Sequence, residues 1–249
     1  MLSQDGLARA LERLRLRAPV RFDEVTASTQ VTAVEMAEAG TPEWTLVAAG
    51  HQTKGRGRLG RSWVDAPGGA LLFSLVLRPD LDPDEGGLLT LLAGTAMARA
   101  CLELADQRTA CKWPNDLMVA GRKAGGIIAE SRIEGGAFAH VVLGMGVNLG
   151  SPPTELPSAG AVDAADDELL EAFLSAFVRA YQPAHPAFAG GVVAAYREVC
   201  ATLDTRVRAT TAGGVIEGDA VDLDERGGLV VRTQSGDEVV RFGAVEHLQ

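Results

Sequence analysis

The sequence has little of what would hold a metal ion or cross-link a small fold. Its 249 residues include only three cysteines (Cys101, Cys111 and Cys200) and four histidines. The cysteines are odd in number and widely spaced, without a Cys-x-x-Cys pair, and the histidines are scattered. Structural zinc needs clustered nitrogen and sulfur ligands, and a disulfide framework needs paired cysteines. The sequence therefore predicts neither a metal site nor a disulfide framework.

Long hydrophobic runs are also missing. No stretch approaches the roughly 18 consecutive apolar residues that predict a membrane-spanning helix. The first 17 residues mix Asp5, Glu12 and several arginines with leucines, so they lack the apolar centre of a signal peptide. We expect a cytoplasmic protein that has no membrane partner.

Positive charge and aromatic side chains are scarce. Lys and Arg number 23 against 33 Asp and Glu, which gives a net charge of -10, and aromatic residues make up 5% of the chain. Nucleic-acid-binding domains usually carry a basic stripe, and single-strand binders stack bases on aromatic side chains. Both features disfavour an RNA-binding module, which is the alternative from a different class.

Against this acidic background, residues 50–63 concentrate basic residues and glycines. Four cations, Lys54, Arg56, Arg58 and Arg61, lie among three glycines within eight residues. Glycine lets a backbone approach a ligand closely, and successive N–H groups and guanidinium groups bind anions. The run predicts a mobile clamp over a phosphate-bearing ligand, although a solvated basic turn would have the same composition. It fits neither a P-loop nor a dinucleotide fingerprint, because no helix or typical βαβ unit follows.

A second polar run follows a short strand at residues 111–119. Pro114 cannot donate to a sheet, so this segment predicts a strand, a turn and a second strand. Asp116 and Lys123 would then lie at the ends of adjacent strands and point at one ligand, where their charges could orient an amine and a carboxylate or phosphate. The alternative is an ordinary turn, in which Asn115 and Asp116 bond the local backbone.

Hydrophobic periodicity and turn residues predict the remaining elements. The predicted helices are 2–16, 31–39, 87–105, 167–182 and 191–200. The predicted strands are 21–25, 45–49, 70–77, 124–130 and 140–149, with a loop at 131–137 and an irregular segment at 150–161. From residue 203 short strands alternate with turns, which predicts a small β-barrel or sandwich. We therefore expect two domains, residues 1–200 and 201–249.

Taken in order, these segments resemble the motifs of biotin protein ligases. They are Ser28-Thr29, residues 52–63, 112–116, 123–126 and 144–148. The resemblance spans about residues 20 to 249 and implies an α+β fold: a mixed sheet with helices, related to class II aminoacyl-tRNA synthetases, followed by an SH3-like barrel. It also implies the reaction. Biotin and MgATP give biotinyl-5′-AMP, and the ε-amine of one carrier lysine then takes the biotin.

The resemblance assigns site residues by position. Catalytic roles fall on Lys123, Arg56 and Asp116. Biotin binding falls on Ser28, Thr29, Gln52, Gly55, Arg56, Lys123, Ile128, Gly144 and Val147. ATP or adenylate binding falls on Arg56, Arg58, Arg61, Trp63, Asn115, Lys112 and Asn148. No resident metal is implied, because Mg²⁺ arrives with ATP.

Departures from the family pattern occur at Leu59, Gln30, Leu72 and Ala124, where many members have other residues, and they affect affinity rather than chemistry. Members with a DNA-binding winged helix carry it before these motifs. About twenty residues precede them here, so we expect no DNA binding. The implied partner is the biotin carboxyl carrier domain of acetyl-CoA carboxylase or a related carboxylase, and a homodimer is compatible with the family. A lipoate–protein ligase is the enzyme alternative, and Gln52, the arginine pair at 56 and 58 and the run 112–116 favour biotin.

Overall fold

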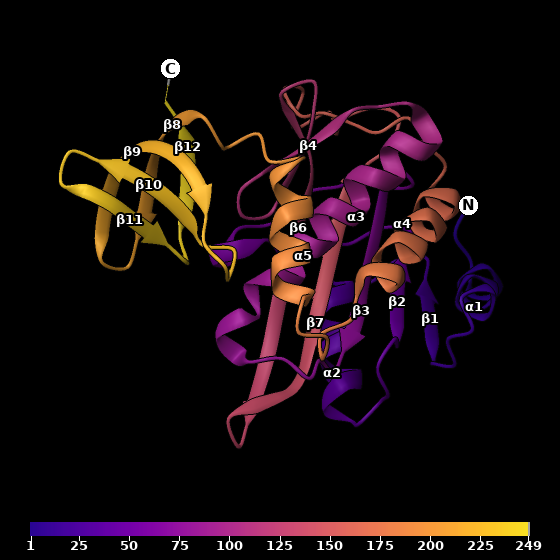
Figure 1. Ribbon diagram of the computed structural model, residues 1–249. Coiled ribbons are helices and arrows are strands. Elements are labelled where there is room, and N and C mark those ends of the chain that lie inside the picture. The colour runs from indigo at the N-terminus through magenta and orange to yellow at the C-terminus, as the bar shows by residue number, and fades with distance from the viewer. Residues whose placement is uncertain (249) are drawn as a thin grey trace.

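The computed structural model describes residues 1–248, which form two sheets with helices packed on the larger one (Figure 1). The larger sheet has seven strands in the order β1-β2-β3-β7-β6-β5-β4. Its strands are β1 Val20–Asp23, β2 Leu46–Ala49, β3 Ala70–Leu77, β4 Thr109–Lys112, β5 Asp116–Val119, β6 Arg122–Glu134 and β7 Ala137–Asn148. Only the β1–β2 pair in this sheet is parallel, so the sheet is mixed.

Helices cover the two faces of this sheet unequally. They are α1 Gln4–Arg13, α2 Thr29–Glu38, α3 Gly87–Ala105, α4 Asp166–Ala180 and α5 Phe188–Arg197, with short 3₁₀ turns η1 Arg58–Gly60 and η2 Pro83–Glu85. The large core joins α1, α3, α4 and α5 to one face. On the other face α2 packs through Ala33 and Ala37 against Val47, Val76 and Val142. The rest of that second face is left for the site.

Strand alternation assigns each residue of β7 to one of these faces. Val142 packs against α2, whereas Val141, Leu143, Met145 and Val147 belong to the large core. Because successive side chains in a strand point to opposite faces, residues 144, 146 and 148 share the α2 face with Val142.

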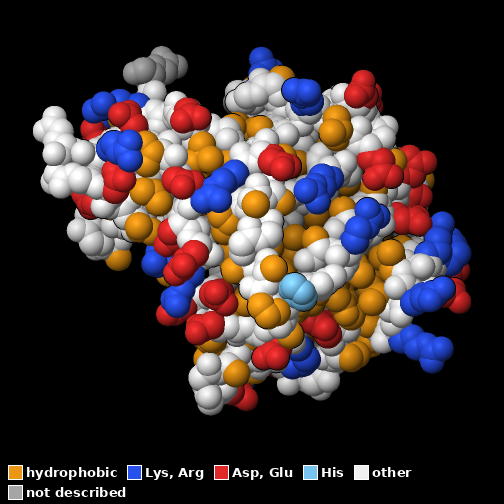
Figure 2. Space-filling view, in the orientation of Figure 1, with side chains coloured by type: hydrophobic (Ala, Val, Ile, Leu, Met, Phe, Trp, Pro, Cys, Tyr) orange, Lys and Arg blue, Asp and Glu red, His pale blue; other side chains and the backbone are white. Residues whose placement is uncertain are grey.

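The α3 helix is the most apolar of the α-helices. With η2 it forms a stretch from Pro83 to Ala105 that is long and apolar enough to cross a membrane by length and composition, and 67% of its most apolar window is buried inside the protein. It is not a run of consecutive apolar residues, because Thr90, Thr95 and Arg99 interrupt it. It packs against α4 and α5 as a core helix. Figure 2 shows acidic and basic side chains intermixed on the side of the molecule that these helices form.

The predicted loop at residues 131–137 was wrong. Strand β6 runs on to Glu134, and β7 begins at Ala137 after a turn of two glycines. Gly135 and Gly136 both have positive φ, 61° and 84°, which is the backbone that a tight hairpin turn needs and that glycine adopts without strain. The result is a long hairpin that projects from the sheet (Figure 1).

The smaller sheet is antiparallel, with strand order β11-β10-β9-β8-β12. Its strands are β8 Thr205–Thr211, β9 Gly214–Leu223, β10 Leu229–Thr233, β11 Gly236–Val240 and β12 Ala244–His247. Where short strands and turns were predicted to alternate, residues 214–223 form one continuous strand, and β12 is a further strand at the end of this sheet. The apolar residues at alternate positions of β8, Val207 and Ala209, are buried, as are Ala220 and Leu223 of β9.

Trp113 joins the two sheets. Its side chain is 2% exposed, and its Nε1 donates a hydrogen bond to the Gly227 carbonyl oxygen at 2.9 Å. Its backbone N–H donates to Thr202 Oγ1 at 2.9 Å. The turn that carries Asn115 and Asp116 is thereby held against the C-terminal sheet.

Candidate active site

The basic loop leaves the end of β2 and returns as a narrow hairpin. Trp63 N–H donates to the Gly55 carbonyl at 2.9 Å, and Gly57 N–H donates to the Arg61 carbonyl at 2.7 Å. A Cβ on Gly55 would lie 2.6 Å from the Trp63 carbonyl oxygen, so only glycine fits there. At the tip Leu59 has φ 55° and is 70% exposed. The base of the loop is therefore closely paired, whereas the Leu59 side chain at its tip is exposed to solvent.

A buried polar cluster lies beside the loop base at the start of α2. Gln52 Oε1 accepts hydrogen bonds from Thr29 N–H at 2.8 Å and from Thr29 Oγ1 at 3.2 Å. Thr29 Oγ1 also lies 3.0 Å from Ser74 Oγ, and Ser74 donates to Gln30 Oε1 at 3.1 Å. Ser28 occupies the helix N-cap position, yet its buried hydroxyl has no partner among the described residues. This cluster can recognise a small polar head group.

Sequence reasoning did not assign Ser74 to the site. The signal was available, because Ser74 is a polar residue in an otherwise apolar strand. Buried hydroxyls are normally hydrogen-bonded, and this one lies on the face that carries Thr29 and Gln30. A single serine in an otherwise apolar strand therefore indicates a hydrogen-bond partner on that face of the sheet.

Trp63 covers the glycine-lined part of the same face. A Cβ on Gly146 would lie 2.5 Å from Trp63 Cε2, and a Cβ on Gly126 would lie 3.5 Å from Cζ3. Gly144 leaves room for Gln30 in the same way, because a Cβ on Gly144 would lie 2.3 Å from Gln30 Oε1. The same Cβ would lie 3.1 Å from Ile128 Cγ1. Glycines at these positions let the indole and the polar cluster reach the sheet.

These residues line one cleft. Its walls include Ser28, Thr29, Gln30, Gln52, Arg56, Trp63, Ser74, Asn115, Gly126, Ile128, Gly144 and Gly146. The cleft thus brings together predicted biotin-binding residues from α2, β6, β7 and the loop.

Val147 is not part of that cleft. Its side chain is fully buried in the core on the opposite face of the sheet. Since Gly144 and Gly146 face the cleft, the odd-numbered neighbour points away from it. The prediction that Val147 forms pocket wall is therefore corrected. Asn148 lies on the cleft's face and donates from Nδ2 to the Gly160 carbonyl at 3.0 Å, while its buried Oδ1 has no partner among residues 1–248.

Charged groups gather at the other end of the loop. Lys123 Nζ donates to Asp116 Oδ1 at 2.6 Å, which joins the beginnings of β5 and β6 as predicted. Arg58 Nη1 donates to Asn115 Oδ1 at 2.9 Å. A second hollow is lined by these four residues together with Arg61, Lys112 and residues 243–245 of the C-terminal sheet. The contribution of residues 243–245 was not predicted, because β12 itself was missed.

The electrostatics of this hollow favour an anion. Burial lowers the pKa of Arg58, the Asp116 carboxylate opposes that shift and Arg61 adds to it. An arginine still carries its charge at neutral pH. Arg56 points elsewhere and forms an ion pair with Glu130 of β6, with Nη1 3.1 Å from Oε1. Both partners are partly exposed (49% and 38%), so this pair is weak and can be exchanged for a ligand.

Within residues 1–248 no three His, Cys, Asp or Glu side chains are grouped so that they could hold a metal ion. The three cysteines are free thiols.

The fold and the site together define a ligase of the biotin and lipoate type. One face of a mixed sheet carries a basic loop, a polar head-group cluster and an ion pair, and this sheet is joined to a small antiparallel sheet. Residues 22–148 match the model of the biotin/lipoate A/B protein ligase family, and residues 202–248 match the biotin protein ligase C-terminal domain. The chain therefore belongs to the biotin/lipoate A/B protein ligase family.

Similarity to curated relatives distinguishes between the biotin and the lipoate ligases of that family. The bifunctional ligase/repressor BirA of Bacillus subtilis is 31% identical over 236 residues, which cover 90% of this chain and 73% of BirA. The biotin–[acetyl-CoA-carboxylase] ligase of Mycobacterium tuberculosis is 32% identical over 240 residues, covering 90% of this chain and 87% of that protein. This protein is accordingly a biotin ligase rather than a lipoate ligase.

Solved structures agree on the fold. The biotin protein ligase from Aquifex aeolicus in complex with biotin and ATP superposes with a TM-score of 0.73 at 24% identity, over 92% of this chain and 99% of that chain. The biotin protein ligase from Leishmania major in complex with biotinyl-5-AMP gives a TM-score of 0.58 at 25% identity, over 93% and 98% of the two chains. The α+β fold, with a mixed sheet and an SH3-like C-terminal sheet, is thereby confirmed.

Proposed function

We propose that the protein condenses biotin with MgATP to biotinyl-5′-AMP and pyrophosphate, then transfers biotin to the lysine ε-amine of a biotin carboxyl carrier domain. The carrier would belong to acetyl-CoA carboxylase or a related carboxylase in the cytoplasm. Residues 1–200 would form the catalytic unit and residues 201–249 a barrel that borders its charged hollow. The observation that carries the proposal is the position of the Asp116–Lys123 pair beside the basic loop, whose base borders the polar cluster.

In the first step a biotin carboxylate oxygen attacks the α-phosphorus of ATP. The new P–O bond replaces the bond to pyrophosphate, which leaves with its Mg²⁺. Negative charge builds on the transferring phosphoryl group, and cations fixed near it lower the barrier. Lys123 would contact the reacting carboxylate, and Arg56, Arg58 and Arg61 would bind the phosphates.

Other residues would hold the two substrates. Ser28, Thr29 and Gln52 would bind the polar head of biotin beside Ile128 and Gly144, with the backbone of Gly55 at its carboxylate. The unpartnered hydroxyl of Ser28 supports this role, since a buried hydroxyl gains from a partner. Trp63, Asn148, Asn115 and Lys112 would contact the adenylate. The orphan acceptor on Asn148 fits an exocyclic amino group in the same way.

In the second step the carrier lysine must be neutral to attack the acyl carbonyl. Its nitrogen forms the amide bond, and AMP departs as the leaving group. Asp116 would take up or orient the proton that the amine loses. Once ordered over the adenylate, the loop would exclude water from the mixed anhydride.

The test is a direct assay of both steps. The protein is incubated with ATP, Mg²⁺ and labelled biotin, with and without a carrier domain, and biotinyl-AMP and labelled carrier are quantified. We expect both products. Labelled lipoate in a parallel reaction should give no adenylate and no labelled carrier. A protein that makes no biotinyl-AMP from biotin would contradict the proposal.

The variant Lys123→Ala sharpens this test. It should lower the rate of biotinyl-AMP formation by about 10²-fold or more, because a positioned cation at developing charge contributes on that scale. Arg122→Ala is the matched control, since Arg122 is the exposed basic neighbour on the same strand. Equal activity in the Lys123 and Arg122 variants would remove Lys123 from the reaction.

A further inference from the structure

Asp65 is a buried carboxylate just beyond the basic loop, and the roles proposed above do not use it. Its side chain is fully buried. Oδ2 accepts a hydrogen bond from His51 Nδ1 at 2.8 Å and a longer one from the Gln52 backbone N–H at 3.4 Å. Oδ1 is buried without a partner among residues 1–248. An ionised carboxylate taken out of water needs such donors, because burying an unpaired charge is costly.

This pair connects the two ends of the loop. His51 and Gln52 are where the loop leaves β2, and Asp65 is where it returns, two residues after Trp63. Gly68 N–H donates to the Gly50 carbonyl at 3.2 Å, which adds a backbone link at the same place. The base of the loop is therefore closed by a side-chain pair and a backbone bond, while the tip between Gly57 and Arg61 extends away.

Asp65 also lies directly behind the polar cluster. Its Oδ2 contacts the backbone of Gln52, and the side chain of Gln52 in turn accepts from Thr29. Neither Asp65 nor His51 is among the residues that line the cleft of the polar cluster. The carboxylate thus acts on the cleft through Gln52 rather than by touching what the cleft would hold.

From this geometry we infer that His51 and Asp65 are positioning residues, which hold the base of the basic loop together and fix Gln52 in the orientation that binds the head of biotin. The inference rests on the proposed function for what the cleft binds. Closing a flexible loop costs conformational entropy, and a site organised in advance does not bear that cost when the ligand arrives.

The pair should affect binding more than chemistry. Because it organises the same contacts for biotin and for biotinyl-AMP, its loss removes uniform binding and raises KM while kcat stays near its original value. Asp65→Ala should raise the KM for biotin by about tenfold and speed release of biotinyl-AMP by a similar factor, the scale of losing a hydrogen bond to a charged group. The kcat of adenylate formation should stay within about twofold.

Substitutions at both positions distinguish a positioning role of the pair from a general structural role. Asp65→Asn keeps an oxygen that accepts from His51 and Gln52, so it should restore the KM to within about threefold of the parent protein. His51→Ala should resemble Asp65→Ala, and the double variant should be no worse than either single variant, as expected of two residues that act as one unit. His185→Ala, at an exposed histidine far from the loop, should match the parent.

Hydrogen exchange of residues 50–65 in the ligand-free protein supplies a readout that does not depend on activity. Exchange should speed up in Asp65→Ala and His51→Ala and stay near the parent rate in Asp65→Asn. Unchanged KM, adenylate release and exchange in Asp65→Ala would overturn the inference, as would losses that multiply in the double variant. If the parent forms no biotinyl-AMP, the proposed function fails and the biotin-orienting role fails with it. The exchange comparison then still decides whether the pair holds the loop.

Discussion

At the scale of single residues, the site depends on glycines, whose lack of a side chain leaves room for other groups. Gly146 faces the cleft from β7, and the Trp63 indole lies where its Cβ would be, 2.5 Å from Cε2 and 2.8 Å from Cζ2. Real Cβ atoms do not approach ring carbons that closely, so the indole can pack on the sheet only because residue 146 has no side chain. The group that approaches the sheet at this strand glycine is the protein's own tryptophan.

This contact predicts the effect of Gly146→Ala. The added methyl group should displace the Trp63 ring and lower kcat/KM for biotinyl-AMP formation by about tenfold or more, since overpacking typically costs 1–3 kcal/mol. Steady-state kinetics and the tryptophan fluorescence change on adding biotin and ATP would measure it. Gly190→Ala is the control, because a Cβ there meets nothing within 4 Å. An unaltered fluorescence response in Gly146→Ala would contradict the packing role.

Single residues also show where the sequence pattern was sufficient to predict the site and where it was not. The loop, Asp116 and Lys123 were recognisable because charge and glycine are concentrated in short runs. Val147 was placed on the wrong face because a motif read as consecutive letters ignores the alternation of a strand. Asp65 went unnoticed because one acidic residue in an acidic chain has no distinguishing local pattern, and its burial depends on how the loop returns.

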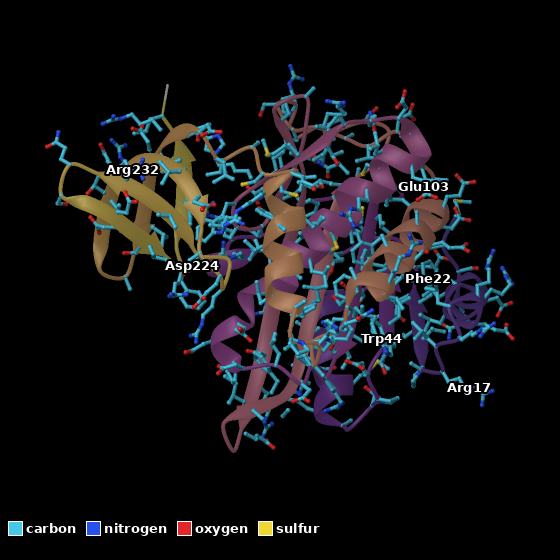
Figure 3. The ribbon with its side chains drawn as sticks, viewed as in Figure 1. Arg17, Phe22, Trp44, Glu103, Asp224 and Arg232 are labelled. Atoms are coloured by element: carbon cyan, nitrogen blue, oxygen red, sulfur yellow. The ribbon has the colours of Figure 1, made fainter. Side chains whose placement is uncertain are left out.

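At the scale of elements, helix α4 supplies the aromatic part of the core. Phe173 and Phe177 stack with ring centroids 5.5 Å apart, and Phe177 and Tyr181 stack at 5.6 Å. Trp44, labelled in Figure 3 near α4, meets Tyr181 edge-on at 5.1 Å. Both phenylalanines are fully buried. These rings form an apolar stripe along α4 that is packed in the core.

From this packing we expect Phe177→Ala to lower the free energy of unfolding by about 3–5 kcal/mol, the usual cost of removing a fully buried aromatic ring. Urea unfolding would measure the change. Turnover per folded molecule should stay unchanged, because α4 lies on the face of the sheet opposite the cleft. Val178→Ala, at a half-buried neighbour on the same helix, should cost much less. A loss below about 1 kcal/mol in Phe177→Ala would show that the core closes over the gap.

Elements also show why sequence patterns predict some structure and not the rest. Strand β3 and helix α3 were predicted with the bounds that the structure has, because each is one apolar run between clear turn residues. The β6–β7 hairpin beyond residue 130 was predicted as a loop because its residues are mostly polar and exposed. Those residues pair with each other through backbone hydrogen bonds, and the sequence signal for the pairing is the Gly135-Gly136 turn between them. Strand β12 was missed because only its pairing with β8 makes four residues a strand.

At the scale of the whole molecule, stability should depend on pH through two histidines, His140 and His247, because burial lowers the pKa of each. His140 is 4% exposed in β7. Burial lowers its pKa, and Arg78 adds to the shift; Arg132 acts in the same direction, whereas Glu38 and Glu134 oppose it. The native state therefore holds His140 neutral at a pH where the unfolded chain already binds a proton. Stability from this group is complete above the unfolded pKa of about 6.5 and is lost as the pH falls from there toward the lowered native value.

We expect the free energy of unfolding to fall between pH 7.5 and pH 5.5, with His140 contributing to the slope below about 6.5. Carboxylates with lowered pKa values, such as Asp167 beside the N-terminal amine, lose their contribution at lower pH and add little in this window. Urea unfolding at the two pH values would measure the difference. His140→Gln keeps a polar side chain without the titration and should make the dependence shallower, with the remainder due to His247. His185→Gln, at an exposed position, should leave it as it is. A His140→Gln protein that loses as much stability on acidification as the parent would show that the acid sensitivity originates elsewhere.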